Sequence, residues 1–480
     1  MMETKITLPS GFIFDAANML GEGLITTTML DELAPRIQAA AEAVEKIRET
    51  GAAKNHLSKD GTPELVYFPR LPFPGKDSPN TSELLQALEA FGEKARKEAD
   101  AVIFCGIGGS YLGGKVLYDC CTSAYWPNNK KDLPQIYFSG NNVDPEDLEG
   151  MKTSLVEAAR KVQQEQHRMY RVLLVPISKS GTTLETTTAF LYFYQELNSL
   201  DTLFTVSGAV VTDKNNAQAP LNQLARQFAW PIFDVPVGVG GRFSVLSEPG
   251  LIVGAVLGMD LNKLLQGARD MDQCCHSAVL TENPALFNAT LKYAGAKYLG
   301  ATIEIIMPYA MRLKALGEWY VQLLAESLGK RKDREGNTVF YGRTPVVAIG
   351  TTDMHAQTQM HQDGRRDKIV QFLFVESRKH RVKTHNPFPA LPVYKRYEGM
   401  DVGRALEVAM EANQAALSGD KRLNALYRVP CIDEYFLGQI FYFLMLSIAY
   451  EGELANVDAY DQPGVEVYKK IMNQTLAEGK

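Results

Sequence analysis

Short apolar runs alternate with helical stretches along most of the chain. Residues 82–100 have helical periodicity, and they are followed at once by AVIFC (101–105), a run with the length of a buried strand. Further strand-like runs follow at 135–139, 171–178, 202–212 and 231–235. Because these runs are apolar without alternation, they are typical of a parallel sheet covered by helices on both faces. The pattern predicts a doubly wound α/β unit.

The second half of the chain repeats this arrangement. Helix-like runs occupy about 250–330, interrupted near GATIEIIMPYA (300–310), and TPVVAIGTTDMHAQ (344–357) again gives strand, polar turn and helix. KIVQFLFVES (368–377) adds another strand. We therefore predict an α/β fold of two doubly wound parallel-sheet domains with flanking helices. The expected division is an N-terminal helical segment with a connecting loop (1–79), a first domain (80–265), a second domain (266–430) and a C-terminal helical segment (431–480).

Charge and hydropathy exclude several classes of protein. The chain has 480 residues and a net charge of −6, so its surface would attract neither nucleic acid nor an anionic membrane. The most apolar stretch, residues 435–450, is shorter than a membrane span and is interrupted by Gly438 and Gln439, which favours a buried helix. The first ten residues carry charge and lack the apolar core of a secretory signal. We expect a cytoplasmic protein.

The cysteines and histidines do not form a recognisable metal motif. No pair of CxxC motifs with zinc-site spacing and no HExxH occurs, and His355 and His361 are not spaced as HxxxH. We therefore expect reduced structural thiols and no metal site. The six cysteines are Cys105, Cys120, Cys121, Cys274, Cys275 and Cys431.

A glycine-rich turn, GIGGSYLGG (106–114), follows the strand-like run at 101–105. A dinucleotide-binding fingerprint starting at Gly106 would need a glycine where Tyr111 stands, which argues against a nicotinamide cofactor. Two readings remain. The turn is either purely structural, or it lets a ligand approach the backbone at Gly109 and Ser110.

A loop rich in hydroxyl groups, SKSGTTLET (178–186), stands between a strand-like run and a helix-like run. Ser178, Ser180 and Thr183 can donate hydrogen bonds to a phosphate group, and the start of the following helix exposes backbone N–H groups. The alternative is a helix N-cap, for which a single hydroxyl would suffice. The density of hydroxyls at the carboxyl edge of a strand favours phosphate. No GxxxxGK[ST] motif is present, which argues against a nucleoside triphosphate.

Six motifs together resemble those of the glucose-6-phosphate isomerase family, in the same order and over about residues 100–475. They are GIGGSYLGG, SKSGTTLET, GGRFSVLS, ESLGK, GTTDMH and DQPGVEVYKK. The resemblance implies two sugar-isomerase (SIS) domains, a homodimer with its sites near the subunit interface, and no cofactor. It also implies the interconversion of glucose 6-phosphate and fructose 6-phosphate, a step of glycolysis and gluconeogenesis.

The resemblance also implies roles for individual residues. Glu326 matches the catalytic glutamate, His355 the ring-opening histidine, Arg242 the arginine of the GGR motif and Lys469 the C-terminal lysine. Substrate binding is implied for the remaining matched positions, which are Gly109, Ser110, Ser178, Lys179, Ser180, Thr183, Gln322 and Gln462.

Taken without the resemblance, these positions have simpler explanations. Glu318, Gln322 and Glu326 form an i, i+4, i+8 row, which is usually a solvated helix face, although the last turn of a helix disfavours the ionised form of a carboxylate. Arg242 alone would suit a surface ion pair, and His355 alone a hydrogen-bonded structural histidine. The segment after His355 departs from the family pattern, which leaves the role of His361 open.

Two other functions compete with the isomerase prediction. A non-catalytic sensor of sugar phosphates would keep the hydroxyl loop but need neither Glu326 nor Lys469, and no basic DNA-binding region accompanies it here. A nicotinamide-dependent dehydrogenase is disfavoured by Tyr111.

Overall fold

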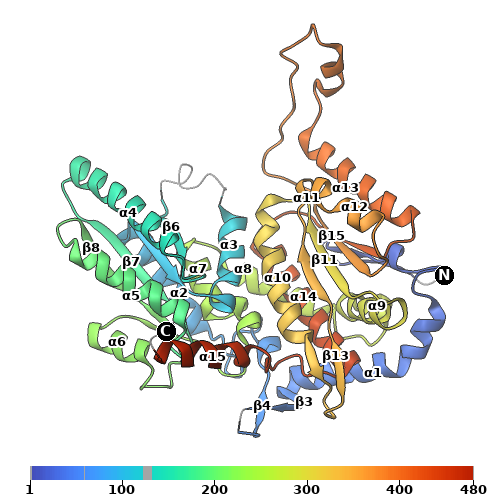
Figure 1. Ribbon diagram of the computed structural model, residues 1–480, viewed down its shortest axis with the longest axis horizontal. Coiled ribbons are helices and arrows are strands. Elements are labelled where there is room, and N and C mark those ends of the chain that lie inside the picture. The colour runs from blue at the N-terminus through green and yellow to red at the C-terminus, as the bar shows by residue number, and fades with distance from the viewer. Residues whose placement is uncertain (1–2, 59, 123–131, 479–480) are drawn as a thin grey trace.

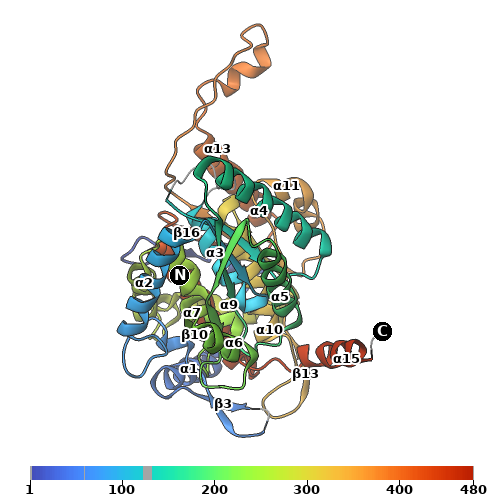
Figure 2. The same ribbon diagram turned by 90° about the vertical axis from the view of Figure 1, so that its left-hand side faces the viewer.

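Two α/β lobes lie side by side and are joined through helices in the middle of the molecule (Figure 1). The computed structural model describes residues 3–58, 60–122 and 132–478. Figure 2 shows the same lobes end on, with two segments that leave the body of the molecule. The alternation of strands and helices predicted from the sequence is confirmed in both lobes.

The first lobe is built on a parallel sheet of four strands in the order β6-β5-β7-β8. Residues of β5 alternate between two apolar clusters: Ile103 packs with helices on one face, and Val102 and Phe104 pack on the other. This two-sided burial explains why the strand has no polar alternation. The strands are β5 (Ala101–Cys105), β6 (Gln135–Ser139), β7 (Tyr170–Pro176) and β8 (Phe204–Gly208).

Helices cover both faces of this sheet, as predicted. The helices of this part of the chain are α2 (Ser82–Glu98), α3 (Leu112–Cys121), α4 (Pro145–Gln166), α5 (Leu184–Ser199), α6 (Pro220–Phe228), α7 (Glu248–Val256) and α8 (Leu261–Gln273). The apolar run at 202–212 is not one strand. It divides into β8 and β9 (Val210–Thr212), and β9 pairs with β10 (Ile232–Asp234) in a separate small sheet.

The second lobe contains a sheet of six strands in the order β1-β2-β16-β15-β11-β14. Strands β16, β15, β11 and β14 are parallel to one another, and two short strands from the N-terminus, β2 and β1, extend the sheet beyond β16 in antiparallel fashion. Sequence reasoning found no strand in the N-terminal segment, because three-residue strands carry too little pattern. The strands are β1 (Lys5–Thr7), β2 (Ile13–Asp15), β11 (Ile303–Pro308), β14 (Thr344–Val347), β15 (Lys368–Val375) and β16 (Asn424–Val429).

The remaining elements connect the lobes or decorate the second sheet. Its helices are α9 (Pro284–Leu299), α10 (Lys314–Leu328), α11 (Thr352–Ala356), α12 (Thr358–Gln362) and α13 (Val402–Gly419), while α1 (Thr27–Thr50) lies along the outside of the lobe. Two hairpins are formed by β3 (Ala52–Leu57) with β4 (Pro63–Leu65), and by β12 (Lys330–Lys332) with β13 (Thr338–Tyr341).

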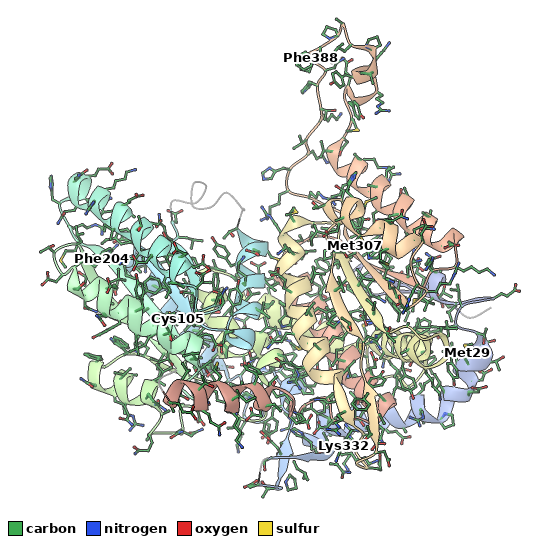
Figure 3. The ribbon with its side chains drawn as sticks, viewed as in Figure 1. Met29, Cys105, Phe204, Met307, Lys332 and Phe388 are labelled. Carbon is green, nitrogen blue, oxygen red and sulfur yellow. The ribbon has the colours of Figure 1, made fainter. Side chains whose placement is uncertain are left out.

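Helix α14 (Glu434–Ala455) forms the centre of the apolar core and packs against α8, α9, α10 and α1. Almost all of its residues are buried, so the most apolar stretch of the chain is the buried helix that was predicted. Among the described residues, we find no helix that is both long and apolar enough to cross a membrane. The side chains in Figure 3 show how the two cores are filled, with Cys105 at the end of β5 in one lobe and Met307 on β11 in the other.

Two segments extend away from the lobes. Residues 378–401, here called the arm, form a long excursion between β15 and α13 with Phe388 at its tip (Figure 3). Helix α15 (Val465–Ala477) stands out from the body in Figure 2, and none of its residues is buried. Both segments carry exposed apolar side chains, including Phe388 and Val393 on the arm and Val467 and Ile471 on α15.

Candidate active site between the two lobes

The glycine turn after β5 lies against a second glycine loop and against helix α10. A Cβ atom on Gly109 would lie 2.0 Å from the carbonyl oxygen of Gly241, and one on Gly108 would lie 2.9 Å from Nε2 of Gln322. Only glycine therefore permits this approach at Gly109. Ser244 reinforces it by donating from Oγ to the carbonyl oxygen of Gly109 over 3.3 Å. The turn thus brings Gly109 and Ser110 beside the loop that carries Arg242.

Arg242 is a buried cation whose hydrogen bonds converge from several segments. Its Nε donates to Ser327 Oγ over 2.7 Å, and its Nη2 donates to the carbonyl oxygens of Ala459 at 2.7 Å and Asp461 at 3.0 Å. Burial lowers the pKa of Arg242, while the nearby Glu326 acts in the opposite direction. The guanidinium is therefore fixed in place, which excludes the surface ion pair considered as its simplest explanation.

Glu326 lies in the last turn of α10, and its side chain remains 24% exposed. One carboxylate oxygen accepts from Gln322 Nε2 at 3.0 Å, and the other lies 3.4 Å from Nη1 of Arg242. The same Nη1 is 3.3 Å from Oε1 of Gln462. Gly329 follows the end of the helix with φ −71° and ψ 82°, so it is not a left-handed cap. The structure thus brings Arg242, Glu326, Gln322 and Gln462 together.

The hydroxyl loop follows β7 and precedes α5, as predicted. Ser178 and Thr183 lie within hydrogen-bonding distance, with 2.9 Å between their hydroxyl oxygens, and Ser178 accepts from the backbone N–H of Gly181. Thr183 occupies the N-cap position of α5 but makes no capping hydrogen bond with its side chain. Its hydroxyl is therefore not consumed by the helix end, which weakens the N-cap explanation.

A pocket of about 450 Å³ adjoins this cluster and is lined by Lys179 and Gln462 among others. Its walls come from both lobes and from the β3–β4 hairpin, including Phe68, Gly240 and Tyr460. The pocket does not itself contain Glu326 or Ser178. Gln462 joins the two features, since it lines the pocket and contacts Arg242.

Two predicted catalytic residues are not brought to this cluster. His355 lies exposed on α11 and makes no side-chain hydrogen bond with any described residue. Lys469 lies exposed on α15, 3.9 Å from Glu466 of the same helix. His361, whose role was open, is buried on α12 and lies apart from Glu326 in a different pocket.

Sequence reasoning missed the residues that support the site from behind. Lys330 is buried, and its Nζ donates to Oδ1 of Asp461 over 2.6 Å and to the carbonyl oxygen of Glu326 over 2.9 Å. Burial lowers the pKa of Lys330, with Asp461 opposing the effect. The one available signal was the position of Lys330 in the ESLGK motif, directly after the helix end. Nothing in the sequence indicated its pairing with Asp461, which is 131 residues away.

Histidines, cysteines and carboxylates do not gather into a metal-binding group anywhere in residues 3–58, 60–122 and 132–478. None of the six cysteines, all of which lie in the described part of the chain, forms a disulfide, and burial raises the pKa of Cys105 to about 12. A thiol with so high a pKa is a poor nucleophile. The site chemistry therefore rests on a carboxylate, a guanidinium, amides and hydroxyls.

Comparison with known proteins assigns the chain to a family. The family model described as phosphoglucose isomerase matches residues 80–480. A glucose-6-phosphate isomerase from Carboxydothermus hydrogenoformans is 34% identical over 431 residues, covering 88% of each chain, and one from Rubrobacter xylanophilus is 31% identical and covers 95% of this chain and 96% of its own.

Solved structures support the same assignment at the level of the fold. The crystal structure of a glucose-6-phosphate isomerase from Chlamydia trachomatis superimposes with a TM-score of 0.78 at 21% identity, over 99% of this chain and 90% of that one. A hypothetical protein from Thermus thermophilus gives a TM-score of 0.77 at 27% identity, over 97% of this chain and 100% of that one. The family match over more than half of the chain, on a fold with this convergence of loops, shows that the protein belongs to the phosphoglucose isomerase family.

Proposed function

We propose that this isomerase interconverts glucose 6-phosphate and fructose 6-phosphate through a cis-enediol intermediate, with Glu326 as the general base. The observation that carries the proposal is the position of the Glu326 carboxylate, which is partly exposed and held between Gln322 and the buried Arg242. A base must be open to the substrate yet fixed in orientation, and this arrangement meets both needs.

The isomerisation requires one proton to move from C2 to C1 and another to move from O2 to O1. Starting from open-chain glucose 6-phosphate, Glu326 removes the proton from C2, the C–H electron pair forms the C1–C2 double bond, and the negative charge moves to O1. Glu326 then returns the proton to C1, while the hydroxyl proton of O2 is transferred to O1, so that O1 becomes a hydroxyl group and O2 becomes the ketone oxygen. Arg242 supplies a fixed positive charge next to the developing enediolate. Because the electrons stay within the substrate, this proposed reaction requires no redox cofactor.

The phosphate group is assigned to the hydroxyl loop. Ser178, Ser180 and Thr183 would donate hydroxyl hydrogen bonds, and the helix start at Leu184 would add backbone N–H groups. Lys179 lines the adjoining pocket and adds a positive charge. The sugar is assigned to Gly109 and Ser110, in the turn where Gly108 lies beside Gln322 and Gly109 beside the Arg242 loop, and Gln462 would bind it from the opposite side.

Ring opening is assigned to His355, assisted by Lys469, in a homodimer whose sites lie near the subunit interface. Within its own chain His355 is exposed and has no described side-chain partner, so a histidine that acts on the sugar must reach it in the assembled protein. The arm supports dimer formation, because Val382, Phe388 and Val393 are each more than half exposed. Apolar side chains on a projecting segment are typical of a contact with another chain.

The proposed reaction can be tested directly. Purified protein is mixed with fructose 6-phosphate in buffer containing EDTA, and glucose 6-phosphate is measured through a coupling dehydrogenase. We expect turnover that EDTA does not change. Binding of the sugar phosphate without turnover would instead indicate a non-catalytic sensor, and turnover restored only by a divalent ion would replace the enediol with a metal-assisted hydride shift.

A further inference from the structure

A small pocket in the second lobe concentrates positive charge. It has a volume of about 150 Å³ and lies at the end of the sheet where β15 and β16 begin. Its lining shares no residue with the cluster around Arg242 and Glu326 or with the hydroxyl loop. The cationic lining residues are Arg365, Arg366, Lys368, Lys421 and Arg422.

The carboxylates beside this pocket do not balance its cations. Asp420 pairs with Arg366 at 3.1 Å and with Arg422 at 2.9 Å, and Asp367 pairs with Lys368 at 2.5 Å. Arg365 and Lys421 have no ion pair within the described part of the chain. Of the described carboxylates, only Asp420 and Asp367 lie within ion-pair distance of these five cations, in a protein whose net charge is −6. Such a local excess in an acidic protein attracts anions specifically to this place.

Hydrogen bonds hold the walls of the pocket in position. Arg366 Nη1 donates to the carbonyl oxygen of Asp420 over 2.7 Å, and Arg422 Nη1 donates to that of Gly364 over 2.7 Å, so the two cationic loops are tied to each other. Lys421 extends over Gly23, where a Cβ atom would lie only 3.3 Å from its Cδ. Arg366 and Arg422 are therefore held in place at the pocket, which reduces the entropy lost when a ligand binds to them.

His361 supplies an unused polar atom in the same pocket. Its residue exposure is 4%, it lines the pocket, and its Nδ1 has no hydrogen-bond partner among the described residues. A buried polar atom without a partner costs free energy. Burial and the neighbouring Lys368 lower the pKa of His361, and Asp353 opposes them. A bound anion would both accept a hydrogen bond from the imidazole and offset the charge of Lys368.

We propose that this pocket is a binding site for a phosphate dianion, either free inorganic phosphate or the phosphoryl end of a small monoester. A tetrahedral dianion presents several acceptor oxygens in different directions, which suits arginine and lysine donors arranged around a small space. The volume fits a phosphoryl group and leaves no room for a nucleoside. The site lies in a different lobe from the hydroxyl loop, so it would bind a second phosphate in addition to the one on the proposed substrate.

The experiment follows the ring signal of His361 by NMR in protein with isotope-labelled histidine. Seven histidines are present, and the signal of His361 is identified by its loss in His361→Gln. Inorganic phosphate and methyl phosphate are titrated in separate arms at low ionic strength, to distinguish the free ion from a monoester. We expect a saturable shift of the His361 signal in at least one arm, with the other six histidines reporting that the fold is intact.

The variant that tests the site is Arg365→Gln/Lys421→Gln, which removes the two unpaired cations. We expect it to raise the dissociation constant seen at His361 at least about 10-fold, since the two positive charges that no described carboxylate neutralises are lost. The control is Arg160→Gln/Lys161→Gln on the exposed surface of α4, which makes the same change of net charge and should leave this constant unchanged. Both double variants should retain isomerase activity.

Equilibrium dialysis with radiolabelled phosphate provides a second measurement that does not depend on the folding of His361→Gln. The wild-type chain should bind one phosphate more than Arg365→Gln/Lys421→Gln, whereas Thr183→Ala should retain this site. A His361 signal that does not move, together with equal stoichiometry in the wild type and the double variant, would overturn the proposal. Loss of the phosphate bound through Thr183 alone would bear on the proposed catalytic site and not on this one.

Discussion

Arg343 and Arg242 are both buried, but they have different kinds of hydrogen-bond partner. Arg343 is fully enclosed: its Nε lies 3.0 Å from Glu304, and its two terminal nitrogens contact both oxygens of Glu451. Lys292 completes this closed cluster at 2.6 Å from Glu304. Arg242 is equally buried, but most of its hydrogen bonds go to neutral oxygens, and its only described carboxylate partner is the partly exposed Glu326.

The difference lies in how much of the charge is already neutralised. In the closed cluster every carboxylate is buried and paired, so the positive charge is largely neutralised and would attract a ligand only weakly. Burial raises the pKa of Glu304, but Lys292 and Arg343 outweigh this effect and lower it to about 2. Around Arg242 the neutral partners fix the guanidinium without cancelling its charge. A buried cation of this second kind can act on a substrate that enters beside it. Substitutions at the two clusters should therefore affect activity and stability in opposite ways.

Glu326→Gln should abolish most activity without affecting stability. The amide keeps the size of the carboxylate and one oxygen that can accept from Arg242, but it cannot accept a proton, so kcat should fall about 10²-fold to 10⁴-fold. Steady-state kinetics and thermal unfolding measure the two quantities, and exchange of the C2 hydrogen with solvent deuterium should fall in parallel. Near-normal isomerisation and exchange in this variant would assign the base to another residue.

Arg343→Met should have the opposite profile. It leaves Glu304 and Glu451 buried without their main partner, so the free energy of unfolding should fall by about 3–5 kcal/mol, while kcat of the folded fraction stays near the wild-type value. Denaturant unfolding gives the stability. Arg404→Met is the control, because its pair with Glu407 at 2.7 Å is on the surface and should be worth less than about 1 kcal/mol. Equal losses in the two variants would contradict a special role for the closed cluster.

Acid should weaken the closed cluster before it unfolds the rest of the lobe. Because the folded-state pKa of Glu304 is about 2, below the usual value of 4.5, its contribution is fully present above pH 4.5 and is lost as the pH falls toward 2. Between pH 6 and pH 3 this amounts to about 2 kcal/mol. Denaturant unfolding at both pH values should show a smaller difference in Glu304→Gln than in the wild type. An identical pH dependence would show that Glu304 does not titrate in this way.

Thr183→Ala should produce the smallest effect, because it removes one neutral donor from the proposed phosphate loop. A hydrogen bond to a charged group contributes about 1.5 kcal/mol, so KM should rise about 10-fold with a smaller change in kcat. Thr188→Ala, one turn further along α5, is the matched control and should change neither parameter. An unchanged KM in Thr183→Ala would move the phosphate group away from this loop.

The sequence predicted the individual strands and loops of the site better than the contacts that form between them. Strand 101–105, the glycine turn and the hydroxyl loop are contiguous in the chain, and their hydrophobic pattern and residue types suffice to place them. Burial of Arg242, in contrast, depends on Ser327 and on the backbone of Ala459 and Asp461, which are 85 to 219 residues away. A single lysine after a helix end, as at Lys330, gives no sign of such long-range pairing.

The doubly wound class of both lobes, the loops that follow their strands and, through the motifs, the family can all be predicted from the order of residues alone. These properties follow from the spacing of apolar residues and from the residue types in turns, both of which involve only neighbouring positions in the chain. The folded arrangement sets which arginine is neutralised by buried carboxylates, as Arg343 is, and which keeps most of its charge, as Arg242 does. The reason is that neutralisation depends on groups brought together from distant segments. The folded arrangement also decided that His355 and Lys469 lie exposed on α11 and α15, since burial is set by what packs against a helix and not by the helix alone.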